Sequence, residues 1–72
     1  MTSNELIKFG ANFLKMNNVK SYILDSELIL SSVSMRKREN FLTNSPFKLS
    51  LKQIKTFNNL IYRRAIAKEP IA

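Results

Sequence analysis

Two helix start signals limit what this 72-residue chain can fold into. Thr2 is followed three residues later by Glu5, and Ser50 is followed at the same spacing by Gln53. In such a capping box, the first hydroxyl accepts a hydrogen bond from the backbone of a helix start while the later side chain reaches back. Apolar residues then recur at helical spacing, and no strand-like alternation is visible. The sequence therefore predicts an all-α fold.

The same signals divide the chain into helices. We expect one helix from the first capping box to Met16, a second that opens at Tyr22 with Ser21 as its N-cap and ends near residues 31–34, and a last one from Ser50 to the Glu69-Pro70 stop. One or two further turns are expected in residues 35–44, which gives a small bundle of four to five helices. Apolar residues point almost all round the second helix, so we expect it to be central and covered on several sides.

Helical spacing also predicts which side chains form the core. The five Phe residues fall mostly at core spacing. The last helix is expected to bury one apolar stripe, which consists of Leu51, Ile54, Phe57, Ile61 and Ala65. Gly10, the single glycine, costs about 1 kcal/mol relative to Ala inside a helix. Either another helix crosses close to it or it is a weak point, and the sequence leaves both open.

The composition argues against catalysis by this chain. It has no Cys and no His, which excludes thiolate metal sites, a cysteine nucleophile and the commonest general base. Asp25 and Glu27, a close carboxylate pair, point about 200° apart on a helix and cannot act together on one substrate. No apolar run approaches the roughly 18 residues that cross a bilayer, and no secretory signal is visible. We expect a cytoplasmic location and no membrane partner.

Positive charge is the strongest functional signal. Twelve Lys and Arg oppose five Asp and Glu, which gives a net charge of +7. Such a surface either keeps a small domain in solution or docks an acidic protein face or a phosphate backbone. Nucleic-acid binding calls for exposed aromatic residues between the charges, and none is evident, so we do not expect nucleic acid as the partner. The candidate partner-contact residues are Arg36, Lys37, Arg38, Lys52 and Lys55.

Two stretches together resemble the HemK/PrmC family, the protein-(glutamine-N5) methyltransferases that modify peptide chain release factors. Residues 25–30, D-S-E-L-I-L, resemble the family's D-A-E-x-L-L helix, with Ser26 in place of the usual Ala. Residues 63–72, R-R-A-I-A-K-E-P-I-A, resemble the family segment that ends in E-P-I-A. The separation of the two stretches also follows the family layout.

This resemblance implies that residues 1–68 are an N-terminal helical substrate-recognition domain and that 69–72 begin a linker to a catalytic domain absent from this chain. No catalytic, cofactor-binding or metal-binding residue is carried over, and S-adenosylmethionine is implied for the parent enzyme only. The implied partners are that catalytic domain and a release factor, whose Gly-Gly-Gln glutamine is methylated. The alternative is a free-standing basic helical domain that binds nucleic acid or acts as an adaptor.

Overall fold

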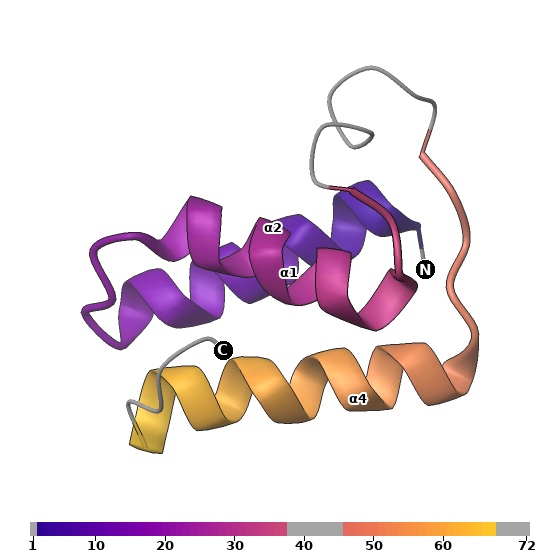
Figure 1. Ribbon diagram of the computed structural model, residues 1–72. Coiled ribbons are helices and arrows are strands. Elements are labelled where there is room, and N and C mark those ends of the chain that lie inside the picture. The colour runs from indigo at the N-terminus through magenta and orange to yellow at the C-terminus, as the bar shows by residue number, and fades with distance from the viewer. Residues whose placement is uncertain (1, 38–45, 68–72) are drawn as a thin grey trace.

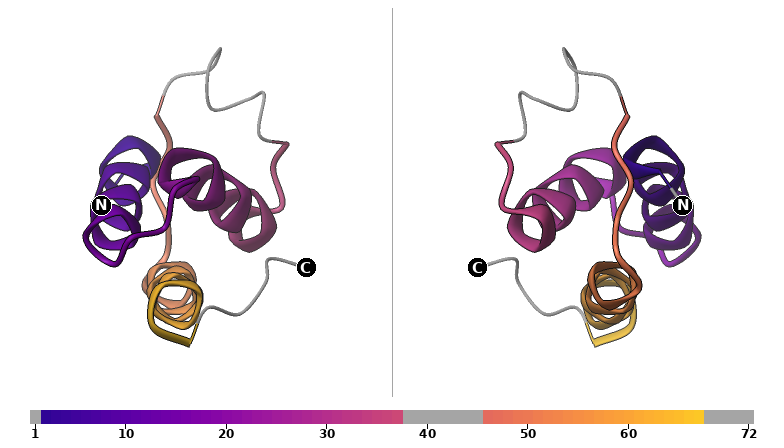
Figure 2. Two further views of the ribbon diagram at one scale, coloured as in Figure 1. Left: turned by 90° about the vertical axis from the view of Figure 1, so that its left-hand side faces the viewer. Right: turned by 90° about the vertical axis from the view of Figure 1, so that its right-hand side faces the viewer.

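Helices make up most of residues 2–37 and 46–67, the part of the chain that this computed structural model describes. Helix α1 spans Ser3–Met16, α2 spans Tyr22–Ser34, and α4 spans Leu51–Tyr62, continuing as a short π-helical segment, η1, over Arg63–Ala67. Helices α1 and α2 run antiparallel, and α4 lies along both (Figure 1). Seen nearly end-on, the three helices occupy the corners of a triangle (Figure 2). The described ranges contain no β-strand, so the predicted all-α class is confirmed.

The expected count of four to five helices is not confirmed, because the described residues form three α-helices and η1. The start of the expected extra turns is not helical. Met35 ends α2 in the left-handed conformation, at φ 58°, and the two residues after it have no regular secondary structure. The remainder of those expected turns, residues 38–45, lies outside the described residues, as does the Glu69-Pro70 stop.

Both predicted capping boxes are present. Glu5 N–H donates to the Thr2 hydroxyl at 3.4 Å, and Thr2 N–H donates to Glu5 Oε1 at 2.9 Å. At the start of α4, the corresponding distances between Ser50 and Gln53 are 3.2 and 3.0 Å. The backbone N–H and then the hydroxyl of Thr2 stabilise the charged carboxylate and lower the pKa of Glu5 below its ordinary value. Ser21 is the N-cap of α2, but its side chain caps nothing.

The segment that enters α4 is fastened to the start of α1. Ser3 N–H donates to the Phe47 carbonyl at 2.7 Å, and Phe47 N–H donates to the Ser3 hydroxyl at 3.1 Å. Next to these bonds, Thr2 and Lys48 form an isolated antiparallel bridge. These contacts join residues more than forty positions apart and set where α4 begins relative to α1.

The core lies where the three helices face one another, and Gly10 is at its narrowest point. A Cβ atom at this position would lie 2.7 Å from Ser26 Oγ, 2.8 Å from Phe57 Cζ and 2.9 Å from Ile61 Cδ1. The first of the two open interpretations is therefore correct: α2 and α4 both approach α1 at this residue. The buried apolar residues of the core are Leu6, Ala11, Leu14, Val19, Ile29, Leu30, Leu49, Phe57, Ile61 and Ala65.

Phe9 is an exception among the described Phe residues, and two expectations about burial, for Leu51 and for α2, are wrong. Phe9 is 51% exposed, because it lies about 120° from the centre of the buried face of α1. Leu51 is 77% exposed, since it is turned about 80° from the stripe formed by the later core residues of α4. Helix α2 buries one face only, and its other side exposes apolar side chains. These are Ile23, Leu24 and Leu28.

We predict that Gly10→Ala destabilises the chain although Ala favours helix by about 1 kcal/mol. The added methyl group would clash with three side chains from two helices, and overpacking of this kind costs about 1–3 kcal/mol. Asn12→Ala, at an exposed position of the same helix, is the control and should be neutral or stabilising. Urea unfolding measures both; a higher midpoint for Gly10→Ala would contradict the close crossing.

The lowered pKa of Glu5 makes a second prediction. The carboxylate contributes stability above its ordinary pKa of 4.5, and this contribution is lost as the pH falls through the lowered folded-state value. Glu5→Gln should therefore reduce stability at neutral pH and flatten its decline on acidification. Thermal melting between pH 7 and acidic pH tests this. Parallel profiles for Glu5→Gln and the unmodified chain would count against the predicted role of the carboxylate.

Candidate partner-binding surface

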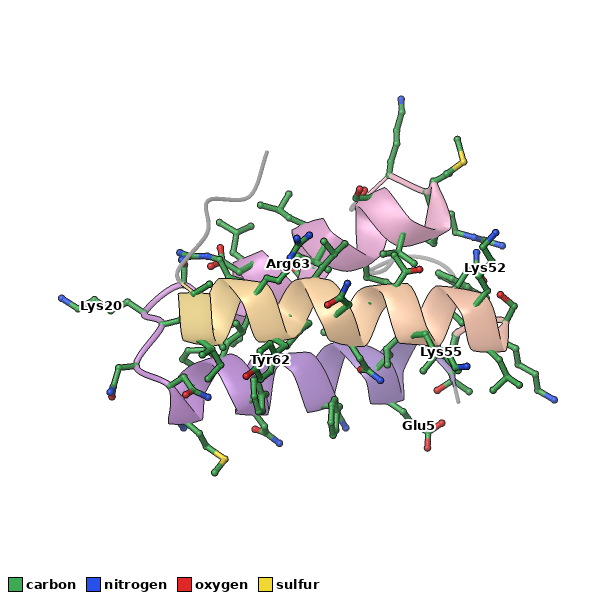
Figure 3. The ribbon with its side chains drawn as sticks, turned by 90° about the horizontal axis from the view of Figure 1, so that it is seen from below. Glu5, Lys20, Lys52, Lys55, Tyr62 and Arg63 are labelled. Carbon is green, nitrogen blue, oxygen red and sulfur yellow. The ribbon has the colours of Figure 1, made fainter. Side chains whose placement is uncertain are left out.

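The described candidate contact residues gather at one end of the bundle, where α2 ends and α4 begins (Figure 1). All four are exposed. Figure 3 shows Lys52 and Lys55 at this end and Lys20 at the opposite end. The predicted contact residue Arg38 lies outside the described residues. We name the four described residues the basic end: Arg36, Lys37, Lys52 and Lys55.

Local interactions hold the α2 side of the basic end. The left-handed Met35 turns the chain out of α2, and the Ser31 hydroxyl donates to the carbonyl of Arg36. The Arg36 guanidinium carbon lies 4.0 Å from the centre of the Phe47 ring, a cation–π distance. The positive charge of Arg36 is thus held close to the segment that leads into α4.

The α4 side of the basic end carries positive charge where a helix does not favour it. Lys52 lies in the first turn of α4, which contains no acidic residue. Cations near a helix N-terminus cost about 0.3–1 kcal/mol, because the unpaired N–H groups there are already positive. Helix stability therefore does not account for Lys52, and its charge adds to a positive potential that suits an anionic partner.

A second surface feature was not predicted from the sequence. Phe9 and Phe13 of α1 and Asn58 and Tyr62 of α4 line an open groove with a volume of about 230 Å³, which we name the aromatic groove. Tyr62 projects from α4 over α1 (Figure 3). Its ring lies 6.4 Å from that of Phe13 with 28° between the ring planes. The signal available in the sequence was the position of Phe9, outside the sector of α1 that the other apolar residues define.

An ion pair joins the two stretches that carry the family resemblance. Arg64 Nε donates to Asp25 Oδ2 at 3.0 Å, and the side chains are 25% and 8% exposed. The next residue of the first stretch, Ser26, is fully buried and donates its hydroxyl to the Ile7 carbonyl at 2.8 Å. Arg64 therefore stabilises the fold through its pairing with Asp25.

Comparison with known proteins identifies the family. The profile of the PrmC N-terminal domain matches residues 5–72, nearly the whole chain. The chain belongs to this family. It is also 38% identical over 58 residues to the release factor glutamine methyltransferase of Buchnera aphidicola subsp. Acyrthosiphon pisum (strain APS). That match covers 81% of this chain and 21% of the relative, so the chain spans about a fifth of the relative's length. No solved structure gives a significant match.

The residues of this chain do not fit S-adenosylmethionine. A glycine-rich loop that cradles such a ligand is ruled out, because the single glycine, Gly10, is buried at the helix crossing. In residues 2–37 and 46–67, no group of three or more His, Cys, Asp or Glu residues could hold a metal ion. Within the same ranges, no helix is long and apolar enough to span a membrane.

We predict that Arg64→Met destabilises the chain by about 2 kcal/mol, because a nearly buried carboxylate loses its partner. Asp25→Asn in the same chain should restore most of that loss, since the amide no longer carries a charge. Denaturant unfolding of the two single variants and the double variant gives the coupling energy. Strictly additive effects would show that Asp25 and Arg64 do not stabilise each other.

Proposed function

We propose that residues 1–68 are the substrate-recognition domain of an S-adenosylmethionine-dependent protein-(glutamine-N5) methyltransferase, with 69–72 beginning the linker to its catalytic domain. The proposed substrate is the glutamine of the Gly-Gly-Gln motif in peptide chain release factors. Membership of the PrmC N-terminal domain family carries the proposal. The name of the Buchnera relative, a release factor glutamine methyltransferase, supports the substrate class. The work of such an enzyme on release factors agrees with a cytoplasmic location.

In this proposal the domain contributes to catalysis without touching the reacting atoms. Contacts between the basic end and an acidic surface of the release factor would supply binding energy remote from the glutamine. That energy restricts the position of the protein substrate, which raises the chance that the amide meets the methyl donor in a reactive orientation. The catalytic domain would supply the cofactor and the residues that act on the amide.

The basic end supports an electrostatic form of recognition. Positive residues near a helix N-terminus create a potential that speeds the encounter with an acidic surface. Attraction between exposed charges is screened over about 10 Å at 0.1 M salt and about 3 Å at 1 M. Recognition through this surface is therefore expected to weaken as salt increases.

Charge reversal at the basic end tests the proposal. In the full-length enzyme, Lys37→Glu combined with Lys52→Glu should lower kcat/KM for the release factor about tenfold at low salt, through slower association. The difference from the unmodified enzyme should shrink at high salt. The methylation rate of a short Gly-Gly-Gln peptide should not change, because such a peptide does not reach this surface.

Lys20→Glu is the matched control, because it makes the same charge change at the opposite end of the bundle (Figure 3). It should change kcat/KM for the release factor less than the double variant does. Equal methylation kinetics for the double variant and the unmodified enzyme at low salt would refute the role of the basic end. Loss of RNA binding, with a steep dependence on salt and unchanged methylation, would favour the nucleic-acid alternative.

A further inference from the structure

The aromatic groove contains aromatic side chains whose exposure to solvent does not stabilise the fold. Phe9 is 51% exposed and Tyr62 is 56% exposed. Burying a large apolar side chain fully is worth about 1.5–3 kcal/mol, and a domain of this size has few such residues to spare. The stacking of Tyr62 on Phe13 also holds the Tyr62 ring in place before any partner arrives. A surface that is apolar and already ordered loses little entropy on binding.

The size of the aromatic groove indicates what kind of group it accepts. Its volume of about 230 Å³ is below the roughly 300–1,000 Å³ of pockets that enclose small-molecule ligands. Its lining consists of three aromatic rings and the amide of Asn58. Large apolar side chains anchored in aromatic pockets are the usual centre of a protein–protein contact. The dimensions therefore suit one anchoring side chain of a protein better than a free metabolite.

The charges along the groove distinguish a protein from a nucleic acid. On α4, residues 56–62 carry no charge, and Lys55 and Arg63 stand on either side of this stretch. Eight residues of helix separate these two cations by about 12 Å. A nucleic-acid strand along the groove would need cations throughout its length. On α1, the carboxylate of Glu5 accepts hydrogen bonds from the backbone N–H and the hydroxyl of Thr2. The pattern suits an occupant that is apolar in its centre and acidic where it meets Lys55.

We propose that the aromatic groove binds an amphipathic segment of the protein substrate, which inserts one large apolar side chain between Phe9 and Tyr62. An acidic residue next to that anchor faces Lys55. The inference rests on the proposed function, because the occupant is a segment of the methylated protein. The groove thus provides the apolar part of recognition, beside the electrostatic part assigned to the basic end.

The test uses the full-length enzyme with two substrates, the release factor and a short Gly-Gly-Gln peptide. Phe9→Ala and Tyr62→Ala should each raise KM for the release factor five- to tenfold, with kcat unchanged. Neither should alter kcat/KM for the short peptide, which has no segment to place in the groove. Ile23→Ala is the matched control, since Ile23 is 54% exposed on α2, and it should stay within twofold of the unmodified enzyme.

A further variant separates docking from folding. Asn58→Arg places a long charged side chain at the exposed edge of the groove and leaves all three rings in place. It should raise KM for the release factor as the alanine variants do, without lowering the melting temperature.

Four results would overturn the proposal. Unchanged KM for the release factor in all three groove variants would show that the groove is not a docking site, while the proposed function would stand. Equal losses on both substrates would show that the groove residues support the enzyme as a whole and do not serve to dock the release factor. Loss of binding to a single-stranded RNA oligonucleotide, with unchanged KM for the release factor, would assign the groove to nucleic acid. An unmodified enzyme that methylates neither substrate would instead refute the proposed function, and the groove proposal with it.

Discussion

The absence of a side chain at Gly10 allows the three helices of this domain to meet. Atoms of Ser26 from α2 and of Phe57 and Ile61 from α4 occupy the space that a Cβ would need. Because α2 and α4 both pack against α1 at this residue, the position of α1 determines where the other two helices lie. Ser26 also orients α2 relative to α1, since its buried hydroxyl donates a hydrogen bond to a backbone carbonyl of α1. The cost of a glycine within a helix is offset by this close packing.

The parts of the fold that depend on neighbouring residues could be predicted from the sequence. Both capping boxes and the bounds of α1 and α2 follow from contacts within a few positions. The exposure of Phe9 and Leu51 could not be predicted in this way. It depends on which sector of each helix faces the others, and that is set by tertiary contacts such as the Ser3–Phe47 hydrogen bonds. The one-sided burial of α2 has the same origin.

The candidate surface also has one part that could be predicted from the sequence and one part that depends on tertiary contacts. The basic residues could be found from the sequence because charge is visible in composition, and helix order then places them at one end. The aromatic groove combines residues of α1 and α4 that are about fifty positions apart, so no local sequence pattern predicts it. The pairing of Arg64 with Asp25 could not be predicted either, because the two residues are 39 positions apart in the sequence.

The features that identify the family are therefore different from those proposed to recognise a partner. Of the two stretches that carry the resemblance, one provides Asp25 and the other Arg64, and these residues pair at the edge of the core. Their interaction stabilises the arrangement of α2 against the end of α4. The basic end and the aromatic groove lie on other residues, whose exposed side chains can change without disturbing that pair. A domain built in this way can keep one fold while its binding surface adapts to the protein that it meets, because the constraints on stability and on recognition fall on separate side chains.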